Sequence, residues 1–231
     1  RRWLSGMLVG KYQKPPSFLA HNPPYLSALP GKDIQYPAIE PTVFSYNKTT
    51  APTDALELIL PGRIITIYPG DQAWLFSVAL GDSETWLGIQ RFSWLPLAKT
   101  NVDPAWVSLL YRTWKYYYAS ARGEWAWHPY TATERAINLI DFAMMHGAPE
   151  SNTSFKDTLR DHAKEIMTRL EYFGEHYTGN HLANNGRGLF QIGLALGDKF
   201  IFLTGYTILI KESERILSPR GILLEGSTHY H

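Results

Sequence analysis

The sequence contains no cysteine, and this absence removes several kinds of chemistry at once. Without cysteine the chain has no disulfide bonds, no thiolate catalysis and no zinc site with cysteine ligands. An excess of charge of one sign is lacking too, since 22 Lys and Arg against 21 Asp and Glu give a formal net charge of +1. So small an excess creates no overall field that attracts nucleic acid, and we expect no nucleic-acid partner.

A long uninterrupted apolar run is also missing. The most apolar stretch, residues 189–210, is broken by Gly197-Asp198-Lys199. A helix that spans a membrane needs about 20 largely uninterrupted apolar residues. We therefore expect two helices here, separated at Gly197, and no membrane span.

Aromatic residues, in contrast, are abundant. They make up 14% of the chain, with 8 Trp and 14 Tyr, and hydrophobic residues make up 45%. This composition is typical of a globular protein and not of a disordered one. Such rings either fill a core or line a surface on which the faces of sugar rings can stack. Core packing is the more common use, and both uses stay open here.

Proline interrupts the first hundred residues repeatedly. Turn signals such as Pro30-Gly31 and Pro61-Gly62 leave room only for short regular segments between them. Residues 63–68 predict a short strand, because they are β-branched or aromatic and bounded by turns. We interpret residues 1–100 as an irregular, proline-rich arm that packs on a helical body.

Helical patterns dominate from residue 103 onward. Asp103-Pro104 combines an N-cap with proline at the first helical position. Short connections between successive helices favour antiparallel neighbours in an all-α array. The expected helices cover residues 106–121, 133–146, 154 to about 177 with Ser154 as its cap, 180–196 and 200–217.

The helix predicted at residues 180–196 separates its polar from its apolar side chains. At about 100° per residue, one narrow stripe contains Asn180, Asn184, Arg187 and Gln191. The stripe has amides and a guanidinium but no Lys or Glu, and these are donors suited to holding a carboxylate or hydroxyls in a cleft. A solvated helix face is the plainer alternative.

Two histidines flank a tyrosine at the end of the chain, in His229-Tyr230-His231. Alternating histidines can bind a metal, but no partner segment with ligand spacing accompanies them, so we expect no metal site. A tyrosine at a cleft can act as a general acid or base when nearby cationic or donor groups lower its pKa. Without such groups it is usually structural.

A third segment of interest precedes and opens the helix predicted at residues 133–146. It contains Trp125, Trp127, His128 and Arg135. Either tryptophan could stack on a sugar ring, with His128 or Arg135 as a polar contact. Packing in the core is the alternative for all four.

Together these segments resemble the helical domain of the heparinase II/III-like polysaccharide lyases, which are related to the oligoalginate lyases. The similarity covers residues from about 74 to 231 and rests on four stretches in the same order, IQRFSWL at 89–95, WHPY to RAIN at 127–138, GNHL at 179–182 and the segment 221–231. The family's fold is an incomplete α/α toroid followed by a β-sandwich, with the active site between them. The resemblance therefore implies that residues 101–231 are part of an α/α toroid, and that a β-sandwich domain lies beyond residue 231.

The resemblance also implies β-elimination on a glycan that contains uronic acid, without a cofactor. Asn180 and His181 would neutralise and orient the carboxylate at C5, and Tyr230 would be the acid and, depending on the substrate, also the base. His231 is a weaker candidate beside it. Other contacts to this acidic polysaccharide would come from Asn184, Arg187, Gln191, Trp127, His128 and Arg135.

Two departures from the family affect these expectations. The family often has an acidic residue where this sequence has Asn184, which leaves the substrate preference open. A further catalytic histidine of the family belongs to its later half, so we expect residues 1–231 alone to bind poorly and to be inactive. Lyases of this kind are usually periplasmic or exported, and we expect the same here, with any targeting segment outside this chain.

Two other classes of function remain as alternatives. The first is a non-catalytic protein that binds glycans or assists envelope assembly on the same toroid, and it would tolerate the loss of Tyr230. The second is a hydrolase, which needs two carboxylates across a cleft. Glu134, Asp141 and Glu225 are available, but no convincing pair emerges from their spacing.

Overall fold

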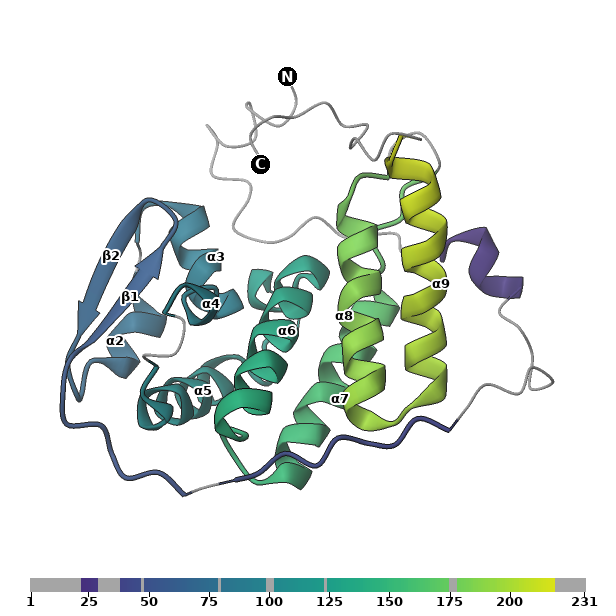
Figure 1. The fold of residues 1–231 in the computed structure, drawn as a ribbon. Helices are drawn as coiled ribbons and strands as arrows, with labels where there is room; N and C mark the ends of the chain where they lie inside the picture. Colours follow the sequence, from purple (N-terminus) through teal and green to yellow (C-terminus); the bar gives the residue numbers. More distant parts are fainter. Residues whose placement is uncertain are drawn as a thin grey trace.

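The computed structural model describes residues 22–28, 38–46, 48–78, 80–98, 102–122, 124–174 and 178–218. Within these ranges the protein is mostly helical with few strands, in agreement with the predicted all-α class. The elements are η1 (Pro24–Ala28), β1 (Leu56–Leu60), β2 (Arg63–Ile67), α2 (Gln72–Ser77), α3 (Ser83–Arg91), α4 (Leu95–Ala98), α5 (Pro104–Tyr118), η2 (Trp125–Trp127), α6 (Pro129–His146), α7 (Asn152–Thr168), α8 (His181–Leu196) and α9 (Lys199–Ile216). Figure 1 shows the strands with α2 to α4 at one side, α6 near the middle and α7 to α9 at the other side.

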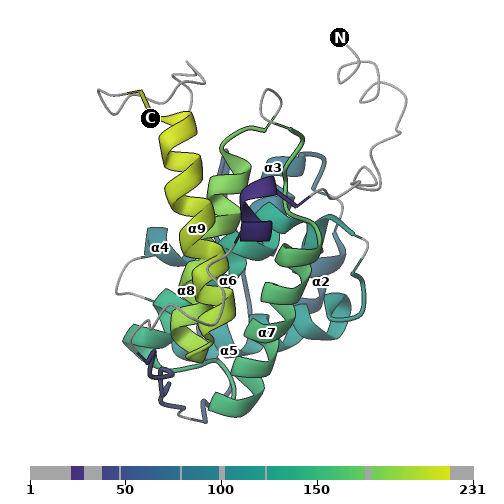
Figure 2. The ribbon, with the colours of Figure 1, turned by 90° about the vertical axis from the view of Figure 1, so that its right-hand side faces the viewer.

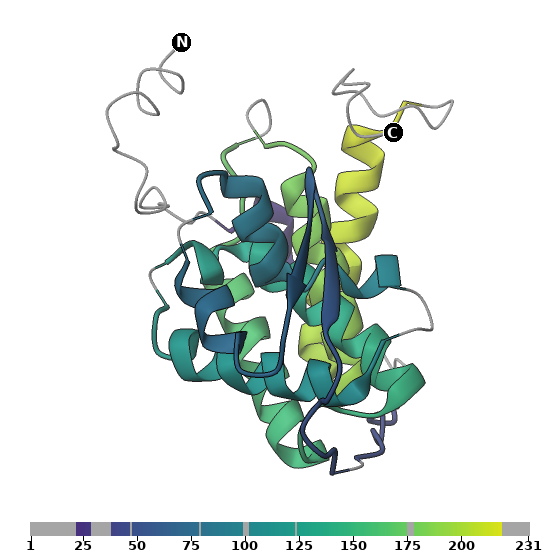
Figure 3. The same ribbon diagram turned by 90° about the vertical axis from the view of Figure 1, so that its left-hand side faces the viewer.

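β1 and β2 form an antiparallel hairpin, seen in front of the helices in Figure 3. Alternate residues of β1 are buried, from Leu56 through Leu58 to Leu60. Gly62 adopts the positive φ of 80° that the connecting turn requires. The strand predicted at residues 63–68 is confirmed as β2. Its partner β1 is not predicted, because leucine is not among the residues that favour strands.

Residues 72–98 are more regular than the irregular arm expected for residues 1–100. They form α2, α3 and α4, and α3 packs against α6. Asp82 caps α3 by accepting hydrogen bonds from two backbone N–H groups, each 3.0 Å long, and Phe92 ends it in the left-handed conformation. Helices this short show no clear helical period in a sequence. The helical body therefore includes α3.

The helices expected after residue 103 are present. α5 begins as predicted, with Asp103 accepting a hydrogen bond of 2.8 Å from the N–H of Ala105 and with Pro104 in the first turn. α6 begins at Pro129 rather than at residue 133. Proline is favoured at the first helical position because its missing N–H has no partner to lose there.

α7 ends well short of the predicted residue 177. Its start is capped by Ser151, whose hydroxyl accepts a hydrogen bond of 3.4 Å from the N–H of Ser154, the residue expected to be the cap. Beyond its end, the N–H of Glu171 donates to Oδ1 of Asn185 at 3.1 Å and not to a carbonyl of the preceding turn. A tertiary hydrogen bond thus replaces helical pairing, which the local sequence does not reveal.

The apolar stretch at residues 189–210 is divided between α8 and α9, as predicted. Gly197 ends α8 in the left-handed conformation with φ 67°. Asp198 caps α9 by accepting hydrogen bonds of 3.0 Å from two backbone N–H groups. In the parts of the chain listed above, no helix is both long enough and apolar enough to cross a membrane.

Glycines let α8 and α9 approach each other closely, and Figure 2 shows the two helices side by side. A Cβ atom added to Gly193 would lie 2.3 Å from the backbone nitrogen of Phe202. One added to Gly205 would lie 2.2 Å from the backbone nitrogen of Phe190. Both distances are far inside van der Waals contact, so the two helices pack backbone to backbone.

α6 is the most central helix, in contact with α3, α7 and α8, while α9 packs on α8. The core around α6 is aromatic. Its fully buried rings include Trp94, Trp106, Tyr111, Trp114, Trp127 and Phe155. For these rings, core packing is therefore the use that the structure shows.

Replacing either close-contact glycine by alanine should destabilise the fold. Alanine favours a helix over glycine by about 1 kcal/mol, but the forced separation of two backbones outweighs this gain, and we expect a net loss of about 2 kcal/mol in the free energy of unfolding. Thermal and urea unfolding of Gly193→Ala and Gly205→Ala would measure it. Glu214→Ala, at an exposed position of α9, is the control and should stay within about 0.5 kcal/mol of the parent. A Gly193→Ala protein of unchanged stability would contradict the close packing.

Candidate functional site

The start of α8 presents the two residues that the sequence singles out most strongly. His181 is the first residue of α8, and Asn180 is its N-cap, although the Asn180 side chain makes no capping hydrogen bond. The His181 side chain is 52% exposed. Its Nδ1 lies 2.8 Å from Oε1 of Glu171, which comes from the segment after α7.

Glu171 is a buried carboxylate, with only 3% of its side chain exposed. Nδ2 of Asn185 donates to its Oε2 at 3.2 Å, and the Glu171 N–H donates to Oδ1 of the same asparagine. Burial alone would raise the pKa of Glu171, but the hydrogen bond from His181, the neighbouring imidazoles of His128 and His181 and the hydrogen bond from Asn185 more than offset it and hold the pKa below its usual range. Glu171 is therefore ionised at neutral pH.

His128 lies near the same carboxylate oxygen. Its Nε2 is 3.7 Å from Oε1 of Glu171, and its ring stacks on Trp125 at 5.1 Å. Burial lowers the pKa of His128 to about 4, even though the neighbouring Glu171 favours the protonated form. His128 is thus neutral at pH 7 and forms no ion pair there. At pH 7 the ionised Glu171 is stabilised by the hydrogen bonds from His181 and Asn185.

Tyr130, in the first turn of α6, packs against the His181 ring of this cluster. Its ring centroid lies 4.6 Å from that of His181, and the Arg91 guanidinium lies 5.0 Å from the Tyr130 ring. Burial and then Glu134 raise the pKa of Tyr130, against the opposing effect of Arg91 and Arg187. Its hydroxyl group is therefore protonated at neutral pH and available as a hydrogen-bond donor.

The remaining residues of the polar stripe follow His181 along α8 beside α6. Arg187 is 48% exposed, and its Nη2 lies 3.4 Å from Oε1 of Glu134 on α6. Asn184 and Gln191 are partly buried, and each has one buried amide atom without a hydrogen-bond partner in the described residues. The stripe thus faces the α6 side of α8 and is not a simple solvated surface.

Trp127, proposed to stack on sugar, lies in the core. It is 1% exposed, and its Nε1 donates to the carbonyl of Tyr118 at 2.6 Å. One face of its ring is covered by the Arg122 guanidinium at 4.0 Å. Core packing, the alternative considered for this residue, is therefore what the structure shows. Trp125 is only partly buried, but its ring is stacked on His128.

Arg135, proposed as a polar contact to substrate, is completely buried. Its Nε donates to Nε2 of His162 at 2.9 Å, and its Nη1 donates to the carbonyls of Gln90 and Ala126 at 3.0 and 2.7 Å. Its guanidinium also lies 4.0 Å from the ring centroid of Trp114. All these partners belong to the core, so Arg135 acts here as a structural cation and not as a surface contact. His128 is likewise buried, at 7% exposure.

Tyr230 and His231 lie outside the described residues, and so does Glu225. Sequence reasoning missed three members of the cluster, namely Glu171, Tyr130 and Arg91. Tyr130 and Arg91 belong to stretches that carry the family resemblance, so a closer look at those stretches could have found them. Glu171 has no such signal, because its role depends on a turn of the chain in space.

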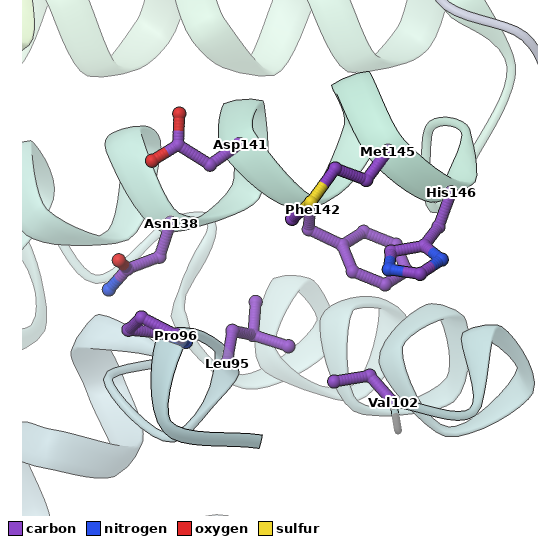
Figure 4. Close-up of a pocket in the computed structure, with 8 residues that line it drawn as sticks. All are labelled: Leu95, Pro96, Val102, Asn138, Asp141, Phe142, Met145 and His146. Atoms are coloured by element: carbon purple, nitrogen blue, oxygen red, sulfur yellow. The ribbon is translucent and has the colours of Figure 1, made fainter. Parts of the chain in front are cut away.

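A cavity of about 240 Å³ lies near the other end of α6, between this helix and α4 (Figure 4). Its walls are mainly apolar, with Leu95, Phe142 and Met145 among them, and Asp141 lies at its edge. Burial raises the pKa of Asp141, while Arg187 opposes this. The cavity is about 16 Å along α6 from Tyr130. It brings no imidazole and carboxylate into contact, so we place the candidate chemistry at His181.

No group of His, Asp and Glu within the described part of the chain is arranged to hold a metal ion. Comparison with known proteins gives no further guide, since no family model, no curated protein and no solved structure matches this chain.

Acid should destabilise this part of the protein. The folded state holds His128 neutral with a pKa of about 4, whereas the unfolded chain binds a proton near pH 6.5. The contribution of His128 to the free energy of unfolding is thus complete at pH 7. It is lost as the pH falls from 6.5 towards 4, and the loss reaches about 2 kcal/mol at pH 5. Urea unfolding at pH 7 and pH 5 would measure it.

The fully buried His162 adds to the same trend, because burial and then Arg135 hold its pKa well below the usual value. A His128→Asn protein should therefore lose less stability than the parent between pH 7 and pH 5, while His162 still contributes. Equal losses in the two proteins would contradict the assignment of a neutral, buried His128.

Proposed function

We propose that this chain contributes to the active site of a polysaccharide lyase that cleaves a uronic acid-containing glycan by β-elimination. The observation that carries the proposal is an exposed imidazole, His181, hydrogen-bonded to the buried carboxylate of Glu171 at 2.8 Å and preceded by Asn180. The resemblance of the segments at 179–182 and 221–231 to the lyase motifs supports the reaction type.

The reaction has three requirements. The carboxylate at C5 of the uronic acid must be neutralised, so that the C5 proton becomes acidic. A base removes this proton, and its electron pair forms the C4=C5 double bond as the C4–O4 bond breaks. An acid then protonates the departing O4. The donors at the start of α8 suit the first requirement, because they would stabilise the negative charge that develops on the carboxylate.

In this proposal Asn180 and His181 bind the substrate carboxylate. The N-terminal end of α8 adds to them, because the backbone N–H groups and the helix dipole favour a negative group there. Tyr230 is the acid, and for some stereochemistries also the base, as the resemblance implies. Tyr130 offers a protonated hydroxyl in the same cluster, and Asn184, Arg187 and Gln191 extend the polar face along α8.

The wider architecture belongs to the same proposal. Successive packing of α3, α6 and α8, with α7 and α9 against them, is the arrangement expected for part of an α/α toroid. A β-sandwich domain of the same protein would complete the cleft and supply a further histidine. The reaction needs no cofactor, and the protein would act on its acidic polysaccharide in the periplasm or outside the cell.

An absorbance assay tests this function, because each elimination creates an unsaturated uronyl end that absorbs ultraviolet light. We expect the full-length protein to act on at least one member of a panel of uronate glycans. His181→Ala and Tyr230→Phe should each lower kcat by about 10²-fold or more while the protein stays folded. His146→Gln, at a histidine near the opposite end of α6, is the control and should retain activity.

The outcome also separates the alternatives. Cleavage that gives no absorbing product would indicate a hydrolase. Glycan binding without turnover, unchanged by Tyr230→Phe, would indicate a non-catalytic binding protein. Either result contradicts the proposed lyase.

A further inference from the structure

We propose that Glu171 is a positioning residue, which holds His181 in the tautomer that carries its proton on Nδ1 and so makes Nε2 the nitrogen that faces the substrate. The catalytic consequence rests on the proposed lyase function. The tautomer itself does not, and it can be measured whether or not the protein is a lyase.

The contact between Glu171 and His181 has a defined polarity. An ionised carboxylate can only accept hydrogen bonds. Because Nδ1 of His181 lies 2.8 Å from Oε1 of Glu171, the imidazole must donate through Nδ1–H. Tyr130 packs on the same imidazole, with ring centroids 4.6 Å apart, and limits its rotation. Nε2 is then the nitrogen left for the substrate, as an acceptor when the ring is neutral and as a donor to the substrate carboxylate when the ring is protonated, which is the form that the proposed function uses.

Glu171 is itself fixed. Oδ1 of Asn185 accepts from the Glu171 backbone N–H at 3.1 Å, so the amide of Asn185 cannot be turned around without losing this bond. Its Nδ2 must therefore face Oε2 of Glu171, at 3.2 Å. The backbone N–H of residue 171 thus determines the orientation of the Asn185 amide. The amide in turn fixes the Glu171 carboxylate, and the carboxylate determines the tautomer of His181.

This chain of hydrogen bonds makes an unusual prediction for Glu171→Gln. A glutamine has one oxygen and one NH₂ group, and Nδ2 of Asn185 requires the oxygen on its side. The NH₂ group must then face Nδ1 of His181, which can accept only if its proton moves to Nε2. The substitution keeps the shape of the side chain and should invert the tautomer of His181.

A second substitution, at Asn185, should restore the parent tautomer of His181. In the double variant Glu171→Gln/Asn185→Asp, the carboxylate at position 185 accepts from the backbone N–H and from the glutamine NH₂ group. The glutamine oxygen is then directed at His181, and the Nδ1–H tautomer returns. The double variant has the same total charge as the parent, with the amide and the carboxylate exchanged.

Nitrogen NMR of the histidine rings, at a pH where His181 is neutral, tests the proposal in the full-length protein. We expect the proton on Nδ1 in the parent, on Nε2 in Glu171→Gln and on Nδ1 again in the double variant. Glu165→Gln, at a partly buried glutamate of α7 that pairs with Arg169, is the matched control and should leave the His181 signals unchanged. A proton on Nε2 in the parent, or an unchanged tautomer in folded Glu171→Gln, would overturn the proposal.

Turnover gives the second readout. Loss of an orienting carboxylate beside a catalytic histidine lowers kcat by up to about 10⁴-fold in the well-studied serine proteases. We expect kcat/KM to fall by about 10²-fold or more in Glu171→Gln, because its NH₂ group disfavours the protonated imidazole that binds the substrate carboxylate, and to rise at least about tenfold in the double variant over Glu171→Gln. The predicted tautomers in a protein without lyase activity would refute the proposed function and leave the positioning role intact. Lyase activity with no change of tautomer would refute the positioning role and leave the proposed function intact.

Discussion

The buried guanidinium of Arg135 is the interaction on which the helical part of this protein depends. From the middle of α6 it donates to the carbonyls of Gln90 and Ala126 and to the imidazole of His162, and it lies over the ring of Trp114. It thereby joins α3, η2, α7 and α5 to a single helix. Removing a cation from water costs several kcal/mol, and no carboxylate hydrogen-bonds to this one among the described residues. Carbonyl dipoles, an imidazole lone pair and indole faces offset the cost instead.

These contacts are directional, and they therefore fix the rotation of α6 about its axis. With Arg135 held towards the core, the neighbouring face of α6 is turned to α8 and carries Tyr130 and Glu134. The same rotation brings His128, just before α6, beside Glu171. The candidate site is thus placed by the core: its residues on α6 could not keep their positions if the guanidinium lost its partners. This arrangement requires a neutral His162. Its Nε2 accepts a hydrogen bond from Arg135, while its Nδ1 lies 2.7 Å from a backbone carbonyl.

The sequence predicts the structural features that depend on neighbouring residues. It does not predict those that depend on tertiary contacts. The cap at Asp103, the stop at Gly197 and the amphipathic α8 are local features, and the structure has them. The end of α7 is not local, since it depends on a hydrogen bond to Asn185. The burial of Arg135 is not local either, because an arginine within an aromatic segment suits a core and a sugar-binding surface equally well. For the site, the sequence identified His181 but not Glu171, although the second residue determines what the first can do.

The environment of Glu171 bears on the choice between a lyase and a protein that only binds glycans. A binding protein needs hydrogen-bond donors and stacking surfaces at its surface, and exposed side chains provide them without a buried charge. An ionised carboxylate with 3% of its side chain exposed is costly, and hydrogen bonds from Asn185 and His181 stabilise its charge. Such a loss of stability is expected where the orientation and protonation of an imidazole matter. They matter in acid–base chemistry and where charge develops during a reaction. A charged carboxylate buried beside an exposed histidine therefore favours the catalytic proposal over the binding one.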